Sequence, residues 1–307
     1  LGDYHSYVTA DNARALEYYA RAQRIAPNDA EILSGAALSE SSLGRWDAAL
    51  EHFEQAHALD PRSFRTAHRL ARTYLWLRRY REAMAAADRA LTLEPASPAG
   101  IQLKGMIFLA RGDLGGARRA LAAAPREADP TTLVSYMAQF WDLFWVLDDR
   151  NQQLLLRLGQ GPFGESREGW ALALAGTHAL RGNAIRAAAY ADTARTALEE
   201  RLRQGDDAQL RVLLGTALAY LGRKDAAIRE GKRAVEMLPV SREAFVGPYI
   251  QHQLARIYIL VGEPELALDQ LVPLLGIPYF LSPGWLKIDP TFEPLRGNAR
   301  FERLVGE

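Results

Sequence analysis

The first part of the chain, residues 1–130, repeats a pattern of alanines, one bulky residue and a proline at a constant 34-residue interval. A small residue at the first and third positions of the pattern lets two helices approach closely, and the bulky residue fills the space between them. Proline then ends the second helix. The period predicts stacked helix pairs. The three clear sets are Ala15, Tyr19, Ala22 and Pro27; Ala49, Phe53, Ala56 and Pro61; and Ala83, Ala87, Ala90 and Pro95.

Glycine marks the turn inside each predicted pair. Leu43-Gly44-Arg45-Trp46 shows it first, and Gly112 follows Gly44 by two such intervals, before a weaker fourth set of Ala117, Leu121 and Ala124. Glycine readily adopts the left-handed conformation that ends a helix. Each unit is therefore interpreted as helix, turn, helix.

This unit resembles the tetratricopeptide (TPR) repeat, a unit of about 34 residues with the same order of small, aromatic and proline positions. The resemblance covers residues 11–130 and is fullest in residues 62–95, although Ala87 stands where the family usually has an aromatic residue. It implies an all-α fold, a right-handed α-solenoid of antiparallel helix pairs. It also implies a non-catalytic scaffold that binds a protein or peptide on its concave face.

A second, 40-residue period replaces the first after a divergent helix pair. Leu180-Arg181-Gly182, Leu221-Gly222-Arg223 and Val261-Gly262-Glu263 recur at this spacing, and we expect the six extra residues to form a loop between units, for example around residues 204–207. The expected organisation is regular units in 1–130, a divergent pair in 131–165, units of the longer period in 166–277 and a C-terminal capping tail in 278–307.

The tail contains two predicted short helices, starting at Asp289-Pro290 and at Asn298. We expect its apolar residues to cover the open end of the stack, as a solenoid requires; these are Phe292, Leu295, Phe301 and Leu304. The tail is similar to the ends of TPR arrays in bacterial multidomain kinase, cyclase-like and winged-helix regulators. This resemblance predicts the interaction or sensory region of a larger bacterial signalling protein, and leaves the compartment open.

Composition and motifs argue against a catalytic, metal-binding or nucleic-acid-binding site in this chain. Lys plus Arg and Asp plus Glu both number 37, so no net charge attracts nucleic acid. Cysteine is absent, the histidines lack ligand spacing, and no phosphate-binding loop or nucleophile-elbow motif occurs. We expect no enzyme activity, no cofactor, no metal, no nucleic-acid partner and no membrane span, because the apolar runs are too short.

Four aromatic residues, Phe140, Trp141, Phe144 and Trp145, crowd the divergent pair and are expected to share one helix face. Core packing is the simplest interpretation, and an exposed patch for an apolar partner is the alternative. A buried polar cluster here would favour a second function, small-molecule binding or association with an enzyme. A nucleic-acid-binding helical repeat is a third hypothesis.

The resemblance also implies which residues face the ligand, because the family binds through fixed positions of the first helix in each unit. The positions that carry a lysine and an asparagine in chaperone-binding members hold Ser34 and Leu38 here, so capture of a chaperone tail is not expected. By register, the predicted concave-face residues are Arg65, His68, Arg72, Trp76, Gln102, Met106, Tyr249, His252 and Arg256.

Neighbouring units carry opposite charge. Residues 28–61 contain seven acidic residues and one arginine, whereas residues 62–95 contain eight arginines and three acidic residues. This contrast predicts attraction across the seam between the units, or orientation of a charged partner along the groove.

Overall fold

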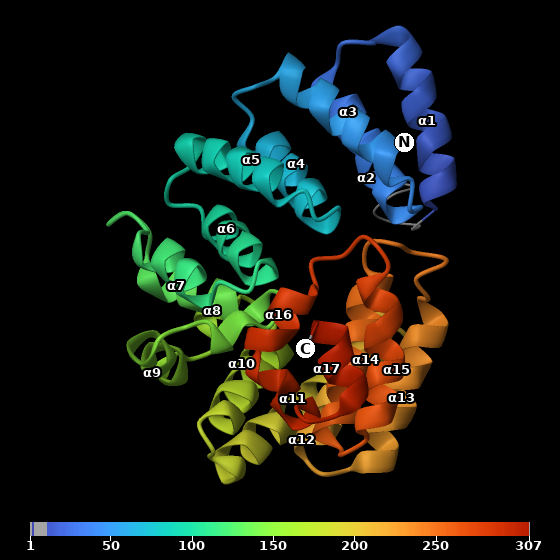
Figure 1. Cartoon of the computed structure of the whole chain (residues 1–307). Helices are drawn as coiled ribbons and strands as arrows, with labels where there is room; N and C mark the ends of the chain where they lie inside the picture. Colours follow the sequence, from blue (N-terminus) through green and yellow to red (C-terminus); the bar gives the residue numbers. More distant parts are fainter. Residues whose placement is uncertain (1, 3–10, 307) are drawn as a thin grey trace.

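The computed structural model describes residue 2 and residues 11–306, so residues 1 and 3–10 of the predicted first segment lie outside the described part. The described residues form helices and no strand, arranged as antiparallel pairs that follow one another along a curved array (Figure 1). The all-α solenoid predicted from the sequence is thus confirmed. The first helices of the pairs are α2 (Ala30–Ser42), α4 (Phe64–Trp76), α6 (Pro98–Ala110), α8 (Pro130–Gln139), α10 (Arg167–Leu180), α12 (Ala208–Tyr220) and α14 (Gly247–Leu260). The second helices are α3 (Trp46–Leu59), α5 (Tyr80–Leu93), α7 (Leu114–Ala122), α9 (Asp149–Arg157), α11 (Ala184–Gln204), α13 (Lys224–Met237) and α15 (Pro264–Leu275), and α1 (Asn12–Ile25) precedes them.

The pattern of alanines and bulky residues forms the seams of the array. Ala15, Ala49, Ala83 and Ala117 are completely buried, and Phe53 fills the adjoining space with almost no exposure. Close approach of helix backbones at these alanines explains why the pattern requires small side chains.

The turns inside the pairs have the predicted left-handed glycines, including Gly44 at φ 73° and Gly112 at φ 76°. In the unit of residues 62–95 the same position is Arg78, which keeps a φ of 58° without being glycine. Its guanidinium Nη2 donates to the carbonyl oxygen of Leu275, at 2.9 Å. An L-residue in this conformation is strained. Here its side chain connects the early part of the array to the end of α15, and at 3.4 Å also to the carbonyl of Leu281 in the tail.

The extra residues of the longer period do not form one kind of loop. In the first case they lengthen α11, which runs for 21 residues and leaves only residues 205–207 before α12. In the second case they lie in residues 238–246, between α13 and α14. The loop predicted around residues 204–207 is present as residues 205–207, but the extra residues lie in α11, because nothing before residue 204 breaks the helix.

The tail forms α16 (Pro283–Ile288), the 3-10 helix η4 (Pro290–Leu295) and α17 (Ala299–Val305). Asp289 and Asn298 cap η4 and α17 as predicted. Phe292, Leu295 and Phe301 are buried, and Leu304 packs against the core.

The tail does more than cover the end of the stack, because it lies between the two arms of the curved array (Figure 1). The backbone N–H of Tyr279 donates to the carbonyl of Trp76, the last residue of α4, at 3.1 Å. The Ser282 hydroxyl donates to the carbonyl of Ala110, the last residue of α6, at 2.6 Å. The sequence predicted a tail that covers the end of the stack. It did not predict that the tail also holds the early units against the late ones.

The connection between α13 and α14 makes a further contact with the start of the array. The N–H of Ala244 donates to the carbonyl of Ser42 at the end of α2, at 2.8 Å. Segments that lie far apart in the sequence therefore meet, and the array curls back on itself.

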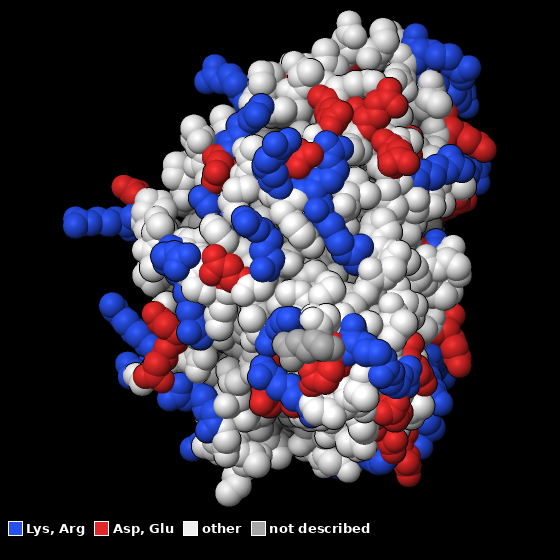
Figure 2. Space-filling model, viewed as in Figure 1, with Lys and Arg blue, Asp and Glu red and all other residues white. Residues whose placement is uncertain are grey.

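The opposite charges of neighbouring units are visible on the surface. Figure 2 shows acidic side chains gathered over α2 and α3, beside basic side chains over α4 and α5. One ion pair crosses this seam, from Arg65 to Glu31 at 2.9 Å, and both side chains are well exposed. An exposed pair contributes only about 0 to 1 kcal/mol, so the contrast adds little to stability.

Candidate functional site

The predicted stripe on α4 runs from solvent into the core. Arg65 is exposed, His68 and Arg72 are half-buried, and Trp76 is completely buried. The Arg72 guanidinium lies 4.5 Å from the centroid of the Phe245 ring, a cation–π contact with the connection before α14. Burial lowers the pKa of His68 to about 4, so this imidazole is neutral at pH 7.

Trp76 stands at the centre of an aromatic cluster contributed by distant segments. Its ring stacks on Phe245 at 5.8 Å and contacts the edges of Trp141, Tyr279 and Phe280 at 5.6 to 6.2 Å. Its indole Nε1 finds no hydrogen-bond acceptor among the described residues. In this conformation Trp76 holds the connection and the tail, and a partner does not reach it.

The two predicted residues on α6 are also buried. The Gln102 amide donates to the carbonyl of Phe140 at 2.8 Å, which fixes the chain where α8 ends. Met106 has almost no exposed surface. Neither residue therefore faces solvent, and Gln102 positions the end of α8.

The three predicted residues on α14 converge on the same region. Tyr249 donates to Asp142 at 3.3 Å, and the Arg256 guanidinium pairs with Asp142 at 2.7 Å. His252 Nδ1 lies 3.2 Å from the Tyr279 hydroxyl of the tail. Burial, with the nearby Arg256 charge, lowers the pKa of His252 to about 3.

Asp142 is the residue that joins these groups, and the sequence did not single it out. It accepts from Tyr249, from the amide of Gln253 at 2.6 Å and from Arg256. Trp141 and Asp142 both have left-handed φ angles, 65° and 55°. Two such residues in succession are strained by about 1 to 3 kcal/mol each, and the contacts of both side chains keep them there.

The four aromatics of the divergent pair do not share a helix face, because α8 ends at Gln139 and a 3-10 turn, η2 (Leu143–Trp145), follows the left-handed pair. Phe144 and Trp145 are buried, as the core interpretation predicts. Trp141 is half-buried, whereas Phe140 has 44% of its surface exposed. Core and surface roles are therefore divided among these four residues.

Phe140 opens onto a pocket of 430 Å³, called the central groove below, formed by the end of α8 and the starts of α10, α12 and α14. Its wall is partly apolar, with Leu172, Leu210 and Leu213 beside Phe140. Its charged residues are mainly acidic: Asp142, Glu168 and Asp207 line it with one cation, Arg201, which pairs with Glu168.

The α4 stripe and the central groove are connected through Tyr136. Burial raises the pKa of the Tyr136 phenol, and the nearby positive charge of Arg72 offsets part of this rise. The Tyr136 ring packs on Phe140, with centroids 4.5 Å apart. Tyr136 thus links Arg72 on α4 to Phe140 at the edge of the central groove.

Within residues 11–306, no group of three or more His, Asp or Glu side chains is placed to hold a metal ion. No helix in that range is both long and apolar enough to cross a bilayer.

Residues 41–107 match the family model described as tetratricopeptide repeat. The chain contains tetratricopeptide repeats. The matched residues include α3, α4 and α5, where the period is fullest, and the TPR period extends on both sides of the match. No curated protein matches the chain.

Solved structures similar to this TPR protein share little sequence with it. PilW, a widely conserved type IV pilus biogenesis factor, is 20% identical with a TM-score of 0.41, and the match covers 75% of this chain and 88% of PilW. A TPR protein from Parabacteroides merdae is 14% identical with a TM-score of 0.40, covering 94% and 92%. Yeast Tom70 is 14% identical with a TM-score of 0.47, covering 87% of this chain and 55% of Tom70.

Proposed function

We propose that this TPR protein is a non-catalytic scaffold that binds an extended segment of a partner protein in the central groove. The observation that carries the proposal is the exposed Phe140 ring beside an apolar wall, with the exposed Asp207 at the edge of the groove. A large aromatic residue on an otherwise charged surface is typical of an interaction site. The groove volume lies within the range of about 300–1,000 Å³ that is usual for binding pockets.

The chemistry of the groove selects the partner segment. Leucines and Phe140 accept apolar side chains, and the exposed carboxylate of Asp207 favours lysine or arginine next to it. The accessible members of the predicted stripe, Arg65 and Arg72, extend the surface with the opposite charge, so a segment with a basic and an acidic end would bind in one direction. Those predicted residues that are buried, Trp76 among them, support this surface from below.

The proposal assigns this chain to the interaction region of a larger bacterial signalling protein. Support for this context is the likeness of the tail to the ends of TPR arrays in bacterial multidomain regulators. The tail contacts both arms of the array, because Tyr279 and Ser282 bond to the ends of α4 and α6 and the Tyr279 hydroxyl lies 3.2 Å from His252 Nδ1 on α14. A shift of one arm caused by a partner would therefore be transmitted to the other.

The buried polar cluster around Asp142 bears on the alternative of a small-molecule site. Both of its carboxylates have partners within the chain: Asp142 pairs with Arg256, and Asp289 accepts from the Trp285 indole at 3.1 Å and from the Thr291 N–H at 2.9 Å. We therefore assign this cluster a structural role in joining the segment after α8 to α14, and place the binding surface outside it.

Selection from a displayed library of random 12-residue peptides tests the proposal. The immobilised chain is expected to enrich peptides that combine leucine or aromatic residues with lysine or arginine. Enrichment on a Phe140→Glu variant should be lost. Equal enrichment on both proteins, or selection of peptides with no such composition, would contradict a binding role of the central groove.

A further inference from the structure

The stacking of the array is interrupted between α7 and α8. Regular second helices such as α3 and α5 have 14 residues, whereas α7 and α9 have nine each. At 1.5 Å per residue, each is shorter by about 7.5 Å. Other second helices pack along the next first helix, as α3 does on α4 and α5 on α6, but α7 ends before it can pack along α8.

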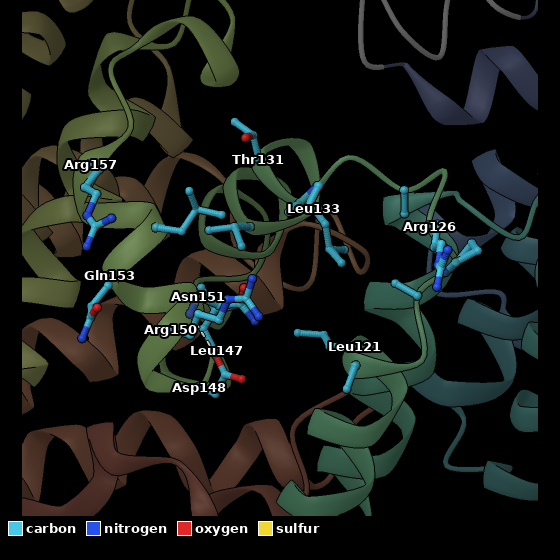
Figure 3. A pocket seen from close by; sticks show the side chains of 17 residues that line it. Leu121, Arg126, Thr131, Leu133, Leu147, Asp148, Arg150, Asn151, Gln153 and Arg157 are labelled. Carbon is cyan, nitrogen blue, oxygen red and sulfur yellow. Dashed lines mark hydrogen bonds between the residues drawn. The ribbon is translucent and has the colours of Figure 1, made fainter.

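A cavity of 820 Å³, called the stacking gap below, lies where those missing turns would be. Figure 3 shows α9 on one side of it and the end of α7 with the following segment on the other. Its apolar lining combines the half-buried Ala124 and Leu154 with three leucines that are almost fully buried, Leu121, Leu133 and Leu147. The shape is that of a helix-packing surface without its helix.

The rim of the stacking gap is basic. Arg126 and Arg150 face each other across the opening, and Arg157 follows on α9 (Figure 3). All three are exposed, and none of them pairs with an acidic side chain in the part of the chain that the structure describes. The one acidic lining residue, Asp148, caps α9 by accepting from the N–H of Asn151 at 2.8 Å. An occupant therefore meets cations around an apolar floor.

We propose that the stacking gap is a docking site for a short acidic amphipathic helix of a partner protein. Such a helix would place leucine-like side chains at positions i, i+3, i+4 and i+7 on the apolar floor, as the missing turns of a second helix would. Its glutamates or aspartates would face Arg126, Arg150 and Arg157, which match carboxylates in charge and in hydrogen-bonding geometry. This site is separate from the central groove, whose lining residues are all different.

Three synthetic 14-residue helical peptides test this proposal against the full chain by fluorescence anisotropy. They share one leucine face and differ only in having glutamate, glutamine or lysine on the polar face. The glutamate peptide is expected to bind at least tenfold tighter than the glutamine peptide, and the lysine peptide more weakly than both. Equal affinities of the three peptides would overturn the proposal.

Charge-reversal variants test whether the peptide binds in the stacking gap. The double variant Arg126→Glu/Arg150→Glu should lose at least tenfold in affinity for the glutamate peptide and gain affinity for the lysine peptide. The matched control is Arg229→Glu/Arg303→Glu, which reverses two arginines far from the gap in sequence. A second variant, Ala124→Trp, fills part of the cavity without changing charge and should also weaken the glutamate peptide, with circular dichroism confirming that each variant is folded. If both double variants weaken the glutamate peptide equally, binding is general electrostatic attraction and the proposal fails.

Discussion

Arg256 on α14 and Asp142 after α8 form an ion pair of 2.7 Å, with the arginine side chain 9% exposed and the aspartate 21% exposed. The pair joins two segments that are distant in the sequence, and it fixes the left-handed turn that directs Phe140 into the central groove.

Asp142→Asn tests the role of this ion pair, because asparagine keeps the shape of the side chain and tolerates the left-handed backbone. Removal of one partner leaves the other charge buried and uncompensated, so the free energy of unfolding should fall by about 2 kcal/mol or more. Urea denaturation followed by circular dichroism measures this fall. The control Glu293→Gln removes one partner of the exposed pair with Arg296 and should change stability by less than about 1 kcal/mol. Equal effects of the two variants would contradict the role of the buried pair.

Arg78 combines a strained backbone with an anchor for the tail. Arg78→Gly and Arg78→Ala both remove the hydrogen bonds to Leu275 at the end of α15 and to Leu281 in the tail, but only glycine relieves the left-handed φ of 58°. The alanine variant should therefore be less stable than the glycine variant by about 1 kcal/mol in urea. Both variants should be cleaved faster than the wild type by chymotrypsin near Tyr279. An alanine variant as stable as the glycine variant would argue against strain at this position.

Gly284 in the tail allows a close backbone contact with the turn at Gly112. A Cβ on Gly284 would lie 2.9 Å from the Gly112 nitrogen and 3.0 Å from the Arg111 carbonyl carbon, which are backbone atoms that move little. Gly284→Ala should therefore lower the free energy of unfolding by about 1 to 3 kcal/mol. Gly205→Ala is the control, since a Cβ there meets open space. Thermal unfolding should separate the two variants, and a neutral Gly284→Ala would mean that the tail is not tightly packed here.

His252 makes the fold sensitive to acid. Its pKa is about 3 in the folded chain and near 6.5 in the unfolded chain, so between these values the unfolded state binds more protons. Stability then rises with pH and is lost as pH falls below 6.5, by about 3 kcal/mol at pH 4. His252→Phe keeps a ring against Phe292 and removes the titration. Urea midpoints at pH 7.5 and pH 4 should differ less for this variant than for the wild type; an unchanged difference would assign acid sensitivity to other groups.

Local patterns were sufficient to predict the helix pairs, their turns and the starts of the short tail helices. Alanine spacing, left-handed glycines and the capping residues Asp289 and Asn298 each act within a few residues of where they occur. The lengthened α11 was missed because nothing before residue 204 breaks a helix and the extra residues had no other distinguishing feature.

Contacts between segments that are distant in the sequence could not be predicted from local patterns. The family register correctly placed Trp76, His252 and Arg256 on first helices, yet the same residues are covered by segments from elsewhere in the chain. No spacing relates Tyr279 to Trp76 or Asp142 to Arg256, since these pairs form only when the array curls and the tail enters between its arms. The exposed Phe140 follows from the left-handed pair after it, which has no glycine to mark it.

The central groove is tested most directly by the affinity of one selected peptide for two matched variants. Phe140 and Val272 are similarly exposed apolar residues, at 44% and 47%, but only Phe140 lines the groove, and Val272 lies on α15. Fluorescence anisotropy should show that Phe140→Glu weakens the labelled peptide at least tenfold, whereas Val272→Glu leaves its affinity unchanged. Equal affinity of the peptide for the wild type and Phe140→Glu would contradict binding in the central groove.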